Sequence, residues 1–442
     1  MSLYEKDSIV ALATPRGIAA LSVVRVSGDS LSSLFSKLTN IKKIVPRYAY
    51  YRKLVDLSDS PIDDVVIIFY QGPSSFTGED LIEVSCHGGD VVAKKIIHDL
   101  IKRGCRYAEP GEFSKRAFLN GKITLAQAEG TNSIIHAKSS LEAEKGFMGL
   151  EGKAHAYLTK AKDSLTSLLT IIEHELDFVE DEIDTLSDAV IKKELEDSIL
   201  LIQKVLQGSL IGNKIQGGFR VSLVGPPNAG KSSLFNSLLG YDRAIISPEK
   251  GTTRDTIEAF VEIGGYPVVL IDTAGHWSGK DKLDALGIKK TEKTIQESDI
   301  ILAIDEKNPK SFIKPFKIKN KPVICIISKS DLGNKIKKDS FDLKTSSLKD
   351  LNVNLLLTHL STEIRSSFFK EDVFLCSERQ LLLLKKSCES LVSLLNNKFT
   401  STDMVEKASV IRVAAEGLRE VFGEIYNEDV LNNIFKGFCV GK

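Results

Sequence analysis

The sequence lacks a net charge, paired cysteines and long apolar runs. Its 59 basic and 59 acidic residues cancel, so no global basic field attracts nucleic acid, and any contact with RNA must use a local patch or a partner. The six cysteines form no Cys-x-x-Cys pair, which argues against a zinc ribbon or a disulfide scaffold and suits a reducing compartment. The N-terminus is polar, and no apolar run has transmembrane length. We expect a cytoplasmic protein without membrane contact.

Hydrophobic periodicity divides the chain into segments of different type. Residues 1–119 combine strand-like runs with an amphipathic helical stretch over 90–103, which is typical of an α+β domain. Residues 120–218 have the spacing of long helices. Residues 219–372 surround a nucleotide-binding motif, and helical spacing resumes over 373–442. The predicted fold class is multidomain α/β plus α, with one discontinuous helical bundle interrupted by an inserted Ras-like P-loop GTPase domain.

A complete phosphate-binding loop lies in the middle of the chain. Residues 225–232 (Gly-Pro-Pro-Asn-Ala-Gly-Lys-Ser) match G-x-x-x-x-G-K-[ST]. A buried strand is expected over 221–224 and a helix over 233–239, which is the context that this motif requires. The glycines let backbone N–H groups turn towards phosphate oxygens, and the helix N-terminus adds partial positive charge. Lys231 would reach the outer phosphates, and the Ser232 hydroxyl would bind Mg²⁺.

The switch motifs of a GTPase follow in order. Residues 251–255 (Gly-Thr-Thr-Arg-Asp) suit a first switch, in which Thr253 binds Mg²⁺ and senses the γ-phosphate. Two strands joined by a Gly-Gly hairpin turn lead to residues 272–275 (Asp-Thr-Ala-Gly), a D-x-x-G motif. Asp272 would hold Mg²⁺ through water, and Gly275 would offer its N–H to the γ-phosphate. Together with the phosphate loop, this order predicts a GTPase.

Residues 328–331 (Ser-Lys-Ser-Asp) stand where GTPases have the base-selecting N-K-x-D motif. The Asp331 carboxylate would accept two hydrogen bonds from guanine N1 and N2, which adenine cannot supply. Ser328 replaces the usual Asn and is shorter, so guanine should still be chosen but bound more weakly. A weak match to the base-side loop lies at 346–347. The predicted nucleotide contacts are Asn228, Ala229, Gly230, Lys231, Ser232, Ser233, Ser247, Thr252, Thr253, Asp272, Thr273, Ala274, Gly275, Lys329, Asp331, Ser346 and Ser347.

The device that supports hydrolysis is open at this point. His276 occupies the position after D-x-x-G where many small GTPases place Gln. It is either a water-orienting group, as in translation factors, or a switch residue that only packs or points to solvent. Asn228 and residues 246–250 suggest a further device, because an Asn in the phosphate loop and carbonyls of a first switch can coordinate a monovalent cation. That cation would sit where an arginine finger otherwise acts.

Two smaller motifs lie outside the nucleotide module. Residues 86–89 (Cys-His-Gly-Gly) follow an expected strand, and with only two adjacent candidate ligands a helix-entry turn is favoured over a metal site. The chain ends in Phe-Cys-Val-Gly-Lys over 438–442. A terminal tail is normally disordered, whereas the preceding amphipathic run over 430–435 could deliver Cys439 into a pocket. Both alternatives stay open.

Several motifs spread along the chain carry a family resemblance. They are residues 75–80 (Ser-Phe-Thr-Gly-Glu-Asp), 86–89, 110–122 (Pro-Gly-Glu-Phe-Ser-Lys-Arg-Ala-Phe-Leu-Asn-Gly-Lys), the phosphate loop, 251–255 and the terminal Cys-x-Gly-Lys. In this combination the chain resembles the MnmE (also called TrmE) family of tRNA-modification GTPases over essentially its full length.

The resemblance implies an activity that the GTPase motifs alone could not indicate. With a flavoprotein partner, MnmG, which would bring FAD and NADH, the family adds an aminomethyl-type (carboxymethylaminomethyl) group to C5 of the wobble uridine of certain tRNAs. The N-terminal domain is folate-binding-like, takes a tetrahydrofolate derivative (5-formyl- or methylene-) and mediates dimerisation. By motif position the folate contacts are Arg25, Glu83, Lys122 and Lys442. Cationic groups suit the folate carboxylate, and Glu83 can accept hydrogen bonds from the amino edge of the pterin.

The resemblance further implies a homodimer whose GTPase modules meet face to face when K⁺ and GTP are bound. The family's water-orienting carboxylate falls on Asp284, where Glu is usual, and His276 replaces a usually apolar residue. The tail residue Cys439 is the second catalytic candidate. The implied metal ligands are Ser232 and Thr253 for Mg²⁺, and Asn228, Ser247, Glu249 and Thr252 for K⁺.

A rival hypothesis belongs to another class of function. The chain would be a non-catalytic, GTP-dependent assembly switch, in which GTP sets conformation only. The phosphate loop and the switches fit this hypothesis equally well, but the folate-type domain and the Cys-x-Gly-Lys tail do not. A test for bound tetrahydrofolate discriminates between the two.

Overall fold

The structure is a computed structural model of the 442-residue chain. It describes residues 7–148, 152–177, 187–241, 257–273, 285–316, 318, 320–332, 340–369, 372–396, 399 and 403–441.

The chain folds into two compact units. Unit 1 consists of residues 1–132 and 416–442, and unit 2 of residues 133–415. The predicted division into four domains, at 119, 218 and 372, stays a prediction. Within the described residues, no helix combines the length and the apolar character needed to span a membrane.

A six-stranded sheet forms the centre of unit 1, with strand order β3-β4-β5-β2-β1-β6. All neighbours are antiparallel except β1 and β6, which are parallel. The strands are β1 (Ile9–Leu12), β2 (Leu21–Gly28), β3 (Ala49–Val55), β4 (Pro61–Tyr70), β5 (Asp80–His87) and β6 (Arg106–Tyr107). The strand-like runs of the sequence at 9–13, 20–26, 65–69 and 81–85 correspond to β1, β2, β4 and β5. The two edge strands, β3 and the two-residue β6, were not predicted, and the burial of β3 does not alternate regularly.

One face of this sheet carries the main hydrophobic core of unit 1. Side chains of β2, β4 and β5 pack there against α1 (Ser32–Thr39) and α2 (Asp90–Lys102). Because side chains alternate along a strand, the other face presents the intervening residues, including Arg25 and Glu83, which are half-buried. Unit 1 also contains α3 (Glu112–Leu119) and α14 (Glu428–Lys436), which pack against each other.

A second six-stranded sheet, of order β12-β11-β10-β7-β9-β8, lies in unit 2. Only β8 pairs antiparallel, through the hairpin in which Gly264 and Gly265 adopt positive φ of 57° and 86°. The other pairs are parallel, as a nucleotide-binding α/β fold requires. The strands are β7 (Phe219–Val224), β8 (Ile257–Ile263), β9 (Tyr266–Asp272), β10 (Ile300–Asp305), β11 (Val323–Ile327) and β12 (Leu343–Lys344).

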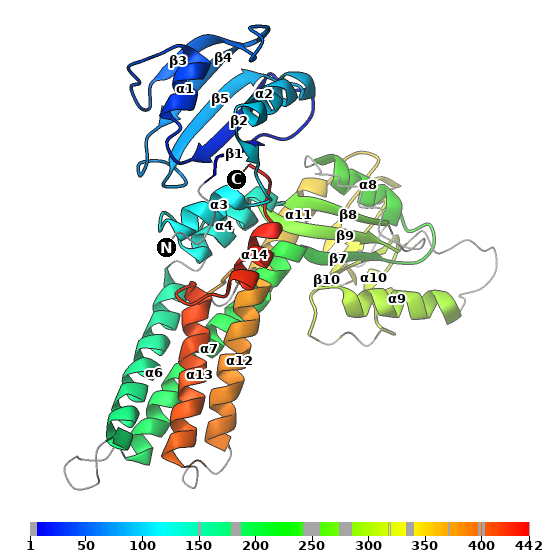
Figure 1. Ribbon diagram of the computed structural model, residues 1–442. Helices are drawn as coiled ribbons and strands as arrows, with labels where there is room; N and C mark the ends of the chain where they lie inside the picture. Colours follow the sequence, from blue (N-terminus) through cyan, green and yellow to red (C-terminus); the bar gives the residue numbers. More distant parts are fainter. Residues whose placement is uncertain are drawn as a thin grey trace. The chain divides into compact units, whose positions relative to one another are not determined.

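Long helices form the rest of unit 2. Figure 1 shows α6 (Lys153–Asp177), α7 (Asp188–Gly217), α12 (Glu378–Asn396) and the adjoining part of α13 (Met404–Phe422) side by side, which agrees with the predicted helical bundle interrupted by the nucleotide module. A Cβ at Gly212 would lie 2.0 Å from the Phe374 carbonyl oxygen, so the segment entering α12 lies directly on α7. The other α-helices within the described residues are α4 (Leu125–His136), α5 (Ser140–Met148), α8 (Lys231–Tyr241), α9 (Ala285–Glu297), α10 (Pro309–Ile313) and α11 (Val353–Phe368).

Candidate functional site

The phosphate loop of unit 2 joins the buried strand β7 to helix α8, as its sequence predicts. Asn228 and Gly230 have positive φ values of 61° and 84°, which turn the backbone around the loop. A Cβ at Gly225 would lie 2.0 Å from the carbonyl oxygen of Ile304, so only glycine fits against β10 there. The loop backbone is therefore in the conformation that cradles phosphate oxygens.

Lys231 is held inside this loop. Its Nζ donates hydrogen bonds to the carbonyl oxygens of Gly225, at 2.9 Å, and Pro226, at 2.8 Å, and the residue is 3% exposed. Burial lowers the pKa of Lys231, and the charge of Asp272 opposes that shift. A desolvated ammonium beside the loop N–H groups offers strong electrostatic stabilisation to a phosphate.

The two predicted magnesium-side groups within the described residues lie together. The Ser232 hydroxyl donates to Asp272 Oδ2 at 2.9 Å, which joins the start of α8 to the end of β9. The Thr273 hydroxyl donates to the Leu223 carbonyl oxygen at 2.8 Å and fixes the backbone that follows. A hydroxyl and a carboxylate are the hard oxygen donors that Mg²⁺ prefers, so these residues fit that ion.

The base-side residues are also preorganised. The Ser346 hydroxyl donates to Asp331 Oδ1 at 2.6 Å, and this hydrogen bond lowers the pKa of Asp331 and keeps it ionised. An ionised carboxylate is the acceptor that guanine recognition needs. Lys329 has a positive φ of 52°, and its ammonium forms an ion pair with Glu306.

Ser328 faces the phosphate loop. A Cβ at Gly230 would lie 3.6 Å from the Ser328 Cβ, and Ser328 is 6% exposed. Within the described residues its hydroxyl has no hydrogen-bond partner. The shorter side chain therefore leaves polar capacity unused at the place where an Asn amide would stand. Of the other predicted contacts, Ala229 is buried, Ser233 is exposed, and the Ser347 carbonyl oxygen accepts from Ser237 at 3.4 Å.

Part of the predicted catalytic machinery lies outside the described residues. This applies to the Mg²⁺, K⁺ and γ-phosphate contacts on the switches, to both candidates for orienting water, and to the terminal lysine. These residues are Ser247, Glu249, Thr252, Thr253, Ala274, Gly275, His276, Asp284 and Lys442. Their roles remain predictions.

A second polar site lies on unit 1, around Arg25 and Glu83. The two residues are cross-strand partners on β2 and β5, and Arg25 Nε and Nη2 both donate to Glu83 Oε1, at 3.0 and 2.7 Å. Their side chains are 19% and 23% exposed. The Arg25 guanidinium also lies 5.5 Å from the ring centroid of Phe76. The sequence-predicted pair thus presents a donor group and an acceptor group side by side to a ligand.

Tyr70 extends this site, although sequence reasoning missed it. Its hydroxyl donates to Glu83 Oε2 at 3.3 Å, so each oxygen of that carboxylate has a partner. Burial and the neighbouring carboxylate raise the pKa of Tyr70. The Arg47 guanidinium lies 5.7 Å from the centroid of the Tyr70 ring. The alternation of β4 places Tyr70 on the Glu83 face, but only the β4–β5 register reveals it.

The C-terminal tail packs against the same site. The Gly441 carbonyl oxygen accepts from Arg25 Nη1 at 3.1 Å. Gly441 has a φ of +94°, and a Cβ there would lie 2.4 Å from the Leu12 carbonyl oxygen, so the tail rests on β1. Cys439 stays exposed, while its carbonyl oxygen accepts from the Gly111 N–H at 3.4 Å. The described part of the tail therefore packs against unit 1, but the Cys439 side chain is not delivered into a pocket.

Lys122 lies beside the loop that contains residues 75–80. A Cβ at Gly78 would lie 3.2 Å from Lys122 Cγ, and Asn120 Nδ2 donates to the Thr77 carbonyl oxygen at 2.7 Å. Among the described residues, no hydrogen bond or ion pair joins Lys122 to Arg25. The Lys122 side chain is exposed beside the loop, and its predicted part in a folate site stays a prediction.

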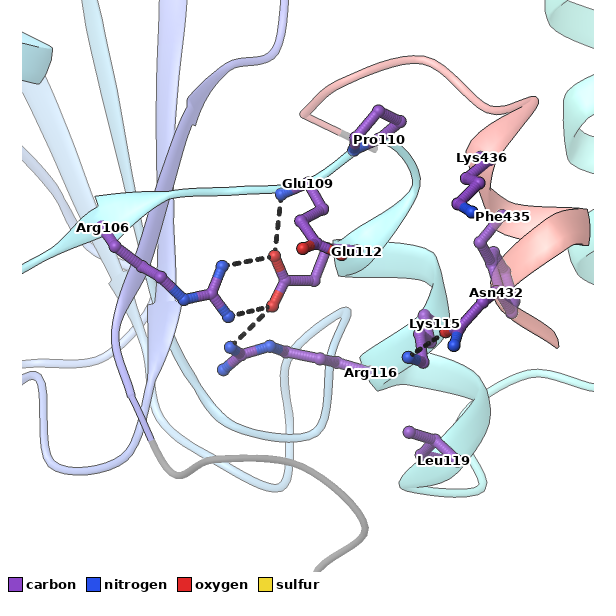
Figure 2. A pocket seen from close by; sticks show the side chains of 10 residues that line it. All are labelled: Arg106, Glu109, Pro110, Glu112, Lys115, Arg116, Leu119, Asn432, Phe435 and Lys436. Atoms are coloured by element: carbon purple, nitrogen blue, oxygen red, sulfur yellow. Dashed lines mark hydrogen bonds and ion pairs between the residues drawn. The ribbon is translucent and has the colours of Figure 1, made fainter. Parts of the chain in front are cut away.

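A buried ion cluster holds α3 against the sheet of unit 1. Arg116 is 2% exposed and forms ion pairs with Glu79, Glu112 and Asp7. Figure 2 shows Glu112 between Arg106 and Arg116, at the wall of a pocket of about 610 Å³. Most guanidinium donors there are already bonded to carboxylates, which leaves the cluster a structural element. The pocket is lined by Arg106, Glu109, Pro110, Glu112, Lys115, Arg116, Leu119, Asn432, Phe435 and Lys436.

Residues 86–89 form the helix-entry turn that the sequence favoured. A Cβ at Gly88 would lie 1.9 Å from the Ala19 carbonyl oxygen, and Gly89 is the N-cap of α2. His87 Nδ1 lies 2.7 Å from Asp63 Oδ1, a hydrogen bond that raises the pKa of His87. Within the described part of the chain, no group of three or more His, Cys, Asp or Glu side chains is arranged to hold a metal ion.

Comparison with known proteins identifies two matching regions. Residues 8–122 match the family described as the GTP-binding protein TrmE N-terminus, and residues 125–439 match the MnmE helical domain. The tRNA modification GTPase MnmE of Aquifex aeolicus (strain VF5) is 35% identical over 448 residues, covering 99% of this chain and 100% of that protein. The protein of the same name from Aliarcobacter butzleri (strain RM4018) is 34% identical, covering 100% of both chains.

Superposition on solved structures is limited. The cytosolic domain of the T. maritima FeoB iron transporter in its GMPPNP form covers 49% of this chain and 98% of its own length, with 21% identity and a TM-score of 0.26.

Proposed function

Since the chain belongs to the MnmE family of tRNA modification GTPases, we propose that it hydrolyses GTP to drive a modification of the tRNA wobble uridine. The product is a carboxymethylaminomethyl-type group on C5, added together with a flavoprotein partner, MnmG. The partner supplies the FAD and NADH chemistry. This chain supplies the nucleotide cycle and a one-carbon site.

Different residues of unit 2 bind the phosphates, the magnesium ion and the base of GTP. Lys231 and the loop N–H groups bind the phosphates, because a buried ammonium and converging amides stabilise negative charge. Ser232 and Asp272 hold Mg²⁺, which when bound neutralises phosphate charge. Asp331, kept ionised by Ser346, selects guanine. Asp284 orients the attacking water.

The residues of unit 1 bind the folate. Arg25 and Lys122 attract its carboxylate, and Glu83 accepts hydrogen bonds from its pterin edge. The donor–acceptor pair on the open sheet face fits such a molecule, since pterin itself carries donors and acceptors on one edge. A tetrahydrofolate derivative, when bound, supplies a one-carbon unit.

The contact between Arg25 and Gly441 carries this proposal. This hydrogen bond places Gly441 on the predicted folate pair, although Gly441 and Arg25 are more than 400 residues apart in the sequence. Gly441 directly precedes Lys442, the predicted folate contact at the terminus. Cys439 is exposed three residues earlier than that lysine, where its thiol can meet a substrate. A switch that only changed shape with GTP would need no such arrangement.

Mass spectrometry of tRNA wobble nucleosides tests the function. Deletion of the gene should abolish the C5 modification, and the wild-type gene should restore it. Complementation with Lys231→Ala and with Arg25→Ala should each fail, because the first disables the nucleotide site and the second the folate site. Unaltered wobble nucleosides in the deletion strain would favour the assembly-switch alternative.

Potassium and dimerisation are proposed as the regulators of turnover. Asn228, in its left-handed conformation within the loop, would hold K⁺ with Ser247, Glu249 and Thr252, and the two GTPase modules of a homodimer would then meet. A fixed cage of oxygens discriminates by ion radius, so hydrolysis should be faster in KCl than in NaCl of equal ionic strength. Equal turnover in the two salts would remove the cation assignment. The Asn228→Ala variant should hydrolyse GTP at the same rate in KCl and in NaCl, and it serves as the matched control for the wild type.

A further inference from the structure

A basic and tyrosine-rich segment lies around the edge strand β3 of unit 1. We call it the β3 strip and define it as Lys42, Lys43, Arg47, Tyr48, Tyr51, Arg52 and Lys53. No acidic residue occurs between Asp29 and Asp56, although the chain as a whole has as many acidic as basic residues. The local composition therefore departs sharply from the average.

The fold turns these side chains outward. Tyr50 and Leu54 are 9% and 2% exposed and anchor β3 to the hydrophobic core. Between these anchors the strand is exposed, and Tyr48 and Tyr51 are 57% and 66% exposed. Figure 1 shows β3 beside β4 at the outer edge of the sheet, in agreement with the strand order. Two exposed tyrosines and five exposed cations thus lie on β3 or in the segment that leads into it, with Lys53 opposite Asp64 of β4.

The cations of the β3 strip differ from the other cationic clusters of unit 1. Arg25, Arg103, Arg106 and Arg116 each form an ion pair with a carboxylate. None of the five strip cations forms an ion pair within the described part of the chain. The Arg47 and Arg52 guanidinium groups donate to backbone carbonyls of Ser74 and Tyr51, at 2.7 and 2.8 Å. These contacts orient the two groups but leave their charge uncompensated.

We propose that the β3 strip is a surface through which the chain contacts tRNA, an inference that rests on the proposed function. Phosphate groups bind lysine and arginine with release of counterions, and unpaired bases stack on exposed aromatic rings. Exposed tyrosines between unpaired cations are suited to a single-stranded loop, where bases are free to leave the stack. With zero net charge over the chain, binding of a polyanion requires such a local patch.

A second copy of this chain is a less suitable occupant of the edge. If two β3 strands paired across a two-fold axis, the β3 edge of one copy would contact the β3 edge of the other. Each copy would bring its five cations into the contact without any acidic residue from 42–53 to oppose them. Like charges placed opposite each other destabilise strand pairing. Charge complementarity therefore favours the nucleic acid.

Fluorescence anisotropy with the full-length chain and an unmodified tRNA transcript tests the inference. Lys43→Ala/Lys53→Ala should weaken binding about tenfold at ~0.1 M salt and reduce the slope of log K against log salt by about 1.4, or 0.7 per lost contact. Tyr48→Ala/Tyr51→Ala should weaken binding about tenfold with an unchanged slope, because stacking releases no counterions. Lys95→Ala/Lys102→Ala removes the same charge from α2 and should change affinity less than twofold.

Three outcomes with the variants would overturn the inference. They are wild-type affinity in both strip variants, equal losses in the α2 control, or conversion of dimer to monomer by light scattering with tRNA affinity unchanged. The last would identify the edge as a contact between copies. If the wild-type chain bound no tRNA, the inference would fail, while loss of the wobble modification on gene deletion would still support the proposed function.

Discussion

The phosphate site of unit 2 and the Arg25–Glu83 site of unit 1 are built in opposite ways. The first takes its loop, lysine and hydroxyl from eight consecutive residues, 225–232, which a strand and a helix hold in place. The second joins Arg25, Glu83 and Gly441 from three distant parts of the chain. A local motif survives small shifts between elements, whereas a site made of distant segments depends on every contact that holds them together.

The two sites also differ in charge. The Lys231 ammonium donates to two neutral carbonyl oxygens. Among the described residues, no carboxylate accepts a hydrogen bond from it, so its positive charge remains available to a ligand. The positive charge of Arg25 is partly offset by its ion pair with Glu83. The first site therefore suits a strongly anionic ligand, and the second suits a ligand with donors and acceptors together. One chain therefore has two kinds of binding site in separate units. One is a buried positive charge suited to an anion, and the other is a donor–acceptor pair suited to hydrogen bonding.

The largest expected effect concerns the second switch of unit 2. Asp284→Asn should lower single-turnover GTP hydrolysis in KCl by about 10²–10⁴, since it removes the group proposed to orient water. His276→Ala should lower it much less, because we assign no chemical role to that side chain. A dead His276→Ala beside a near-normal Asp284→Asn would reverse the assignment. Asp284→Glu restores the methylene found in the family and should speed hydrolysis if the short side chain is limiting.

The next effect concerns the ion cluster that supports unit 1. Arg116→Ala leaves Glu79 and Glu112 buried without their shared cation, which should cost about 3–5 kcal/mol in urea unfolding. Lys115→Ala, next to it and bonded to Asn432, is the matched control and should cost under about 1 kcal/mol. Equal losses in both variants would mean that the cluster adds nothing beyond helix packing.

The same cluster predicts an acid limit. Burial raises the pKa of Glu112, but hydrogen bonds from Arg106 and the Glu109 N–H outweigh it, so the folded pKa lies below the unfolded one. Its contribution to stability is present above the unfolded pKa, about 4.3, and is lost as pH falls through the lower folded value. The wild type should therefore lose more stability below about pH 4 than Arg116→Ala does.

A smaller effect separates the two sites directly. Arg25→Ala and Lys122→Ala should each weaken tetrahydrofolate binding by about 2 kcal/mol, or roughly thirtyfold, through loss of a charge-assisted contact. GTP affinity should stay unchanged in both, since the phosphate loop belongs to unit 2. Calorimetric titration with each ligand measures both quantities. Unchanged folate affinity in the two variants would refute the transfer of the folate site to these positions.

The smallest expected effect concerns Ser328 and the affinity for the guanine base of the nucleotide. Ser328→Asn should tighten GDP binding by about 1 kcal/mol, or fivefold, because an amide can use the polar capacity that the serine hydroxyl leaves. Ser328→Ala should be nearly neutral, since that hydroxyl bonds to no described residue. ADP should bind far more weakly than GDP to every variant that keeps Asp331. Comparable GDP and ADP affinities would mean that Asp331 is not at the base edge.

Sequence reasoning succeeded where the information was local. Three such segments are the loop at 225–232, the hairpin at Gly264 and the turn at 86–89. Each requires particular backbone angles or a close approach of the backbone, and its glycine residues indicate this in the sequence. It missed β3, because three consecutive exposed residues break the alternation that marks a strand. It also missed Tyr70, which reaches Glu83 only through the register of two strands.

By itself, the sequence determined that the chain contains a phosphate-binding loop and the motifs of one family, and it predicted a base-selecting carboxylate. Such motifs depend on neighbouring residues, whose spacing sets their geometry directly. Only the tertiary structure decided that Gly441 lies on Arg25 and that the β3 strip forms one exposed edge. Those features arise from pairing between strands and from packing of distant segments, which the order of residues does not specify until the whole unit has folded.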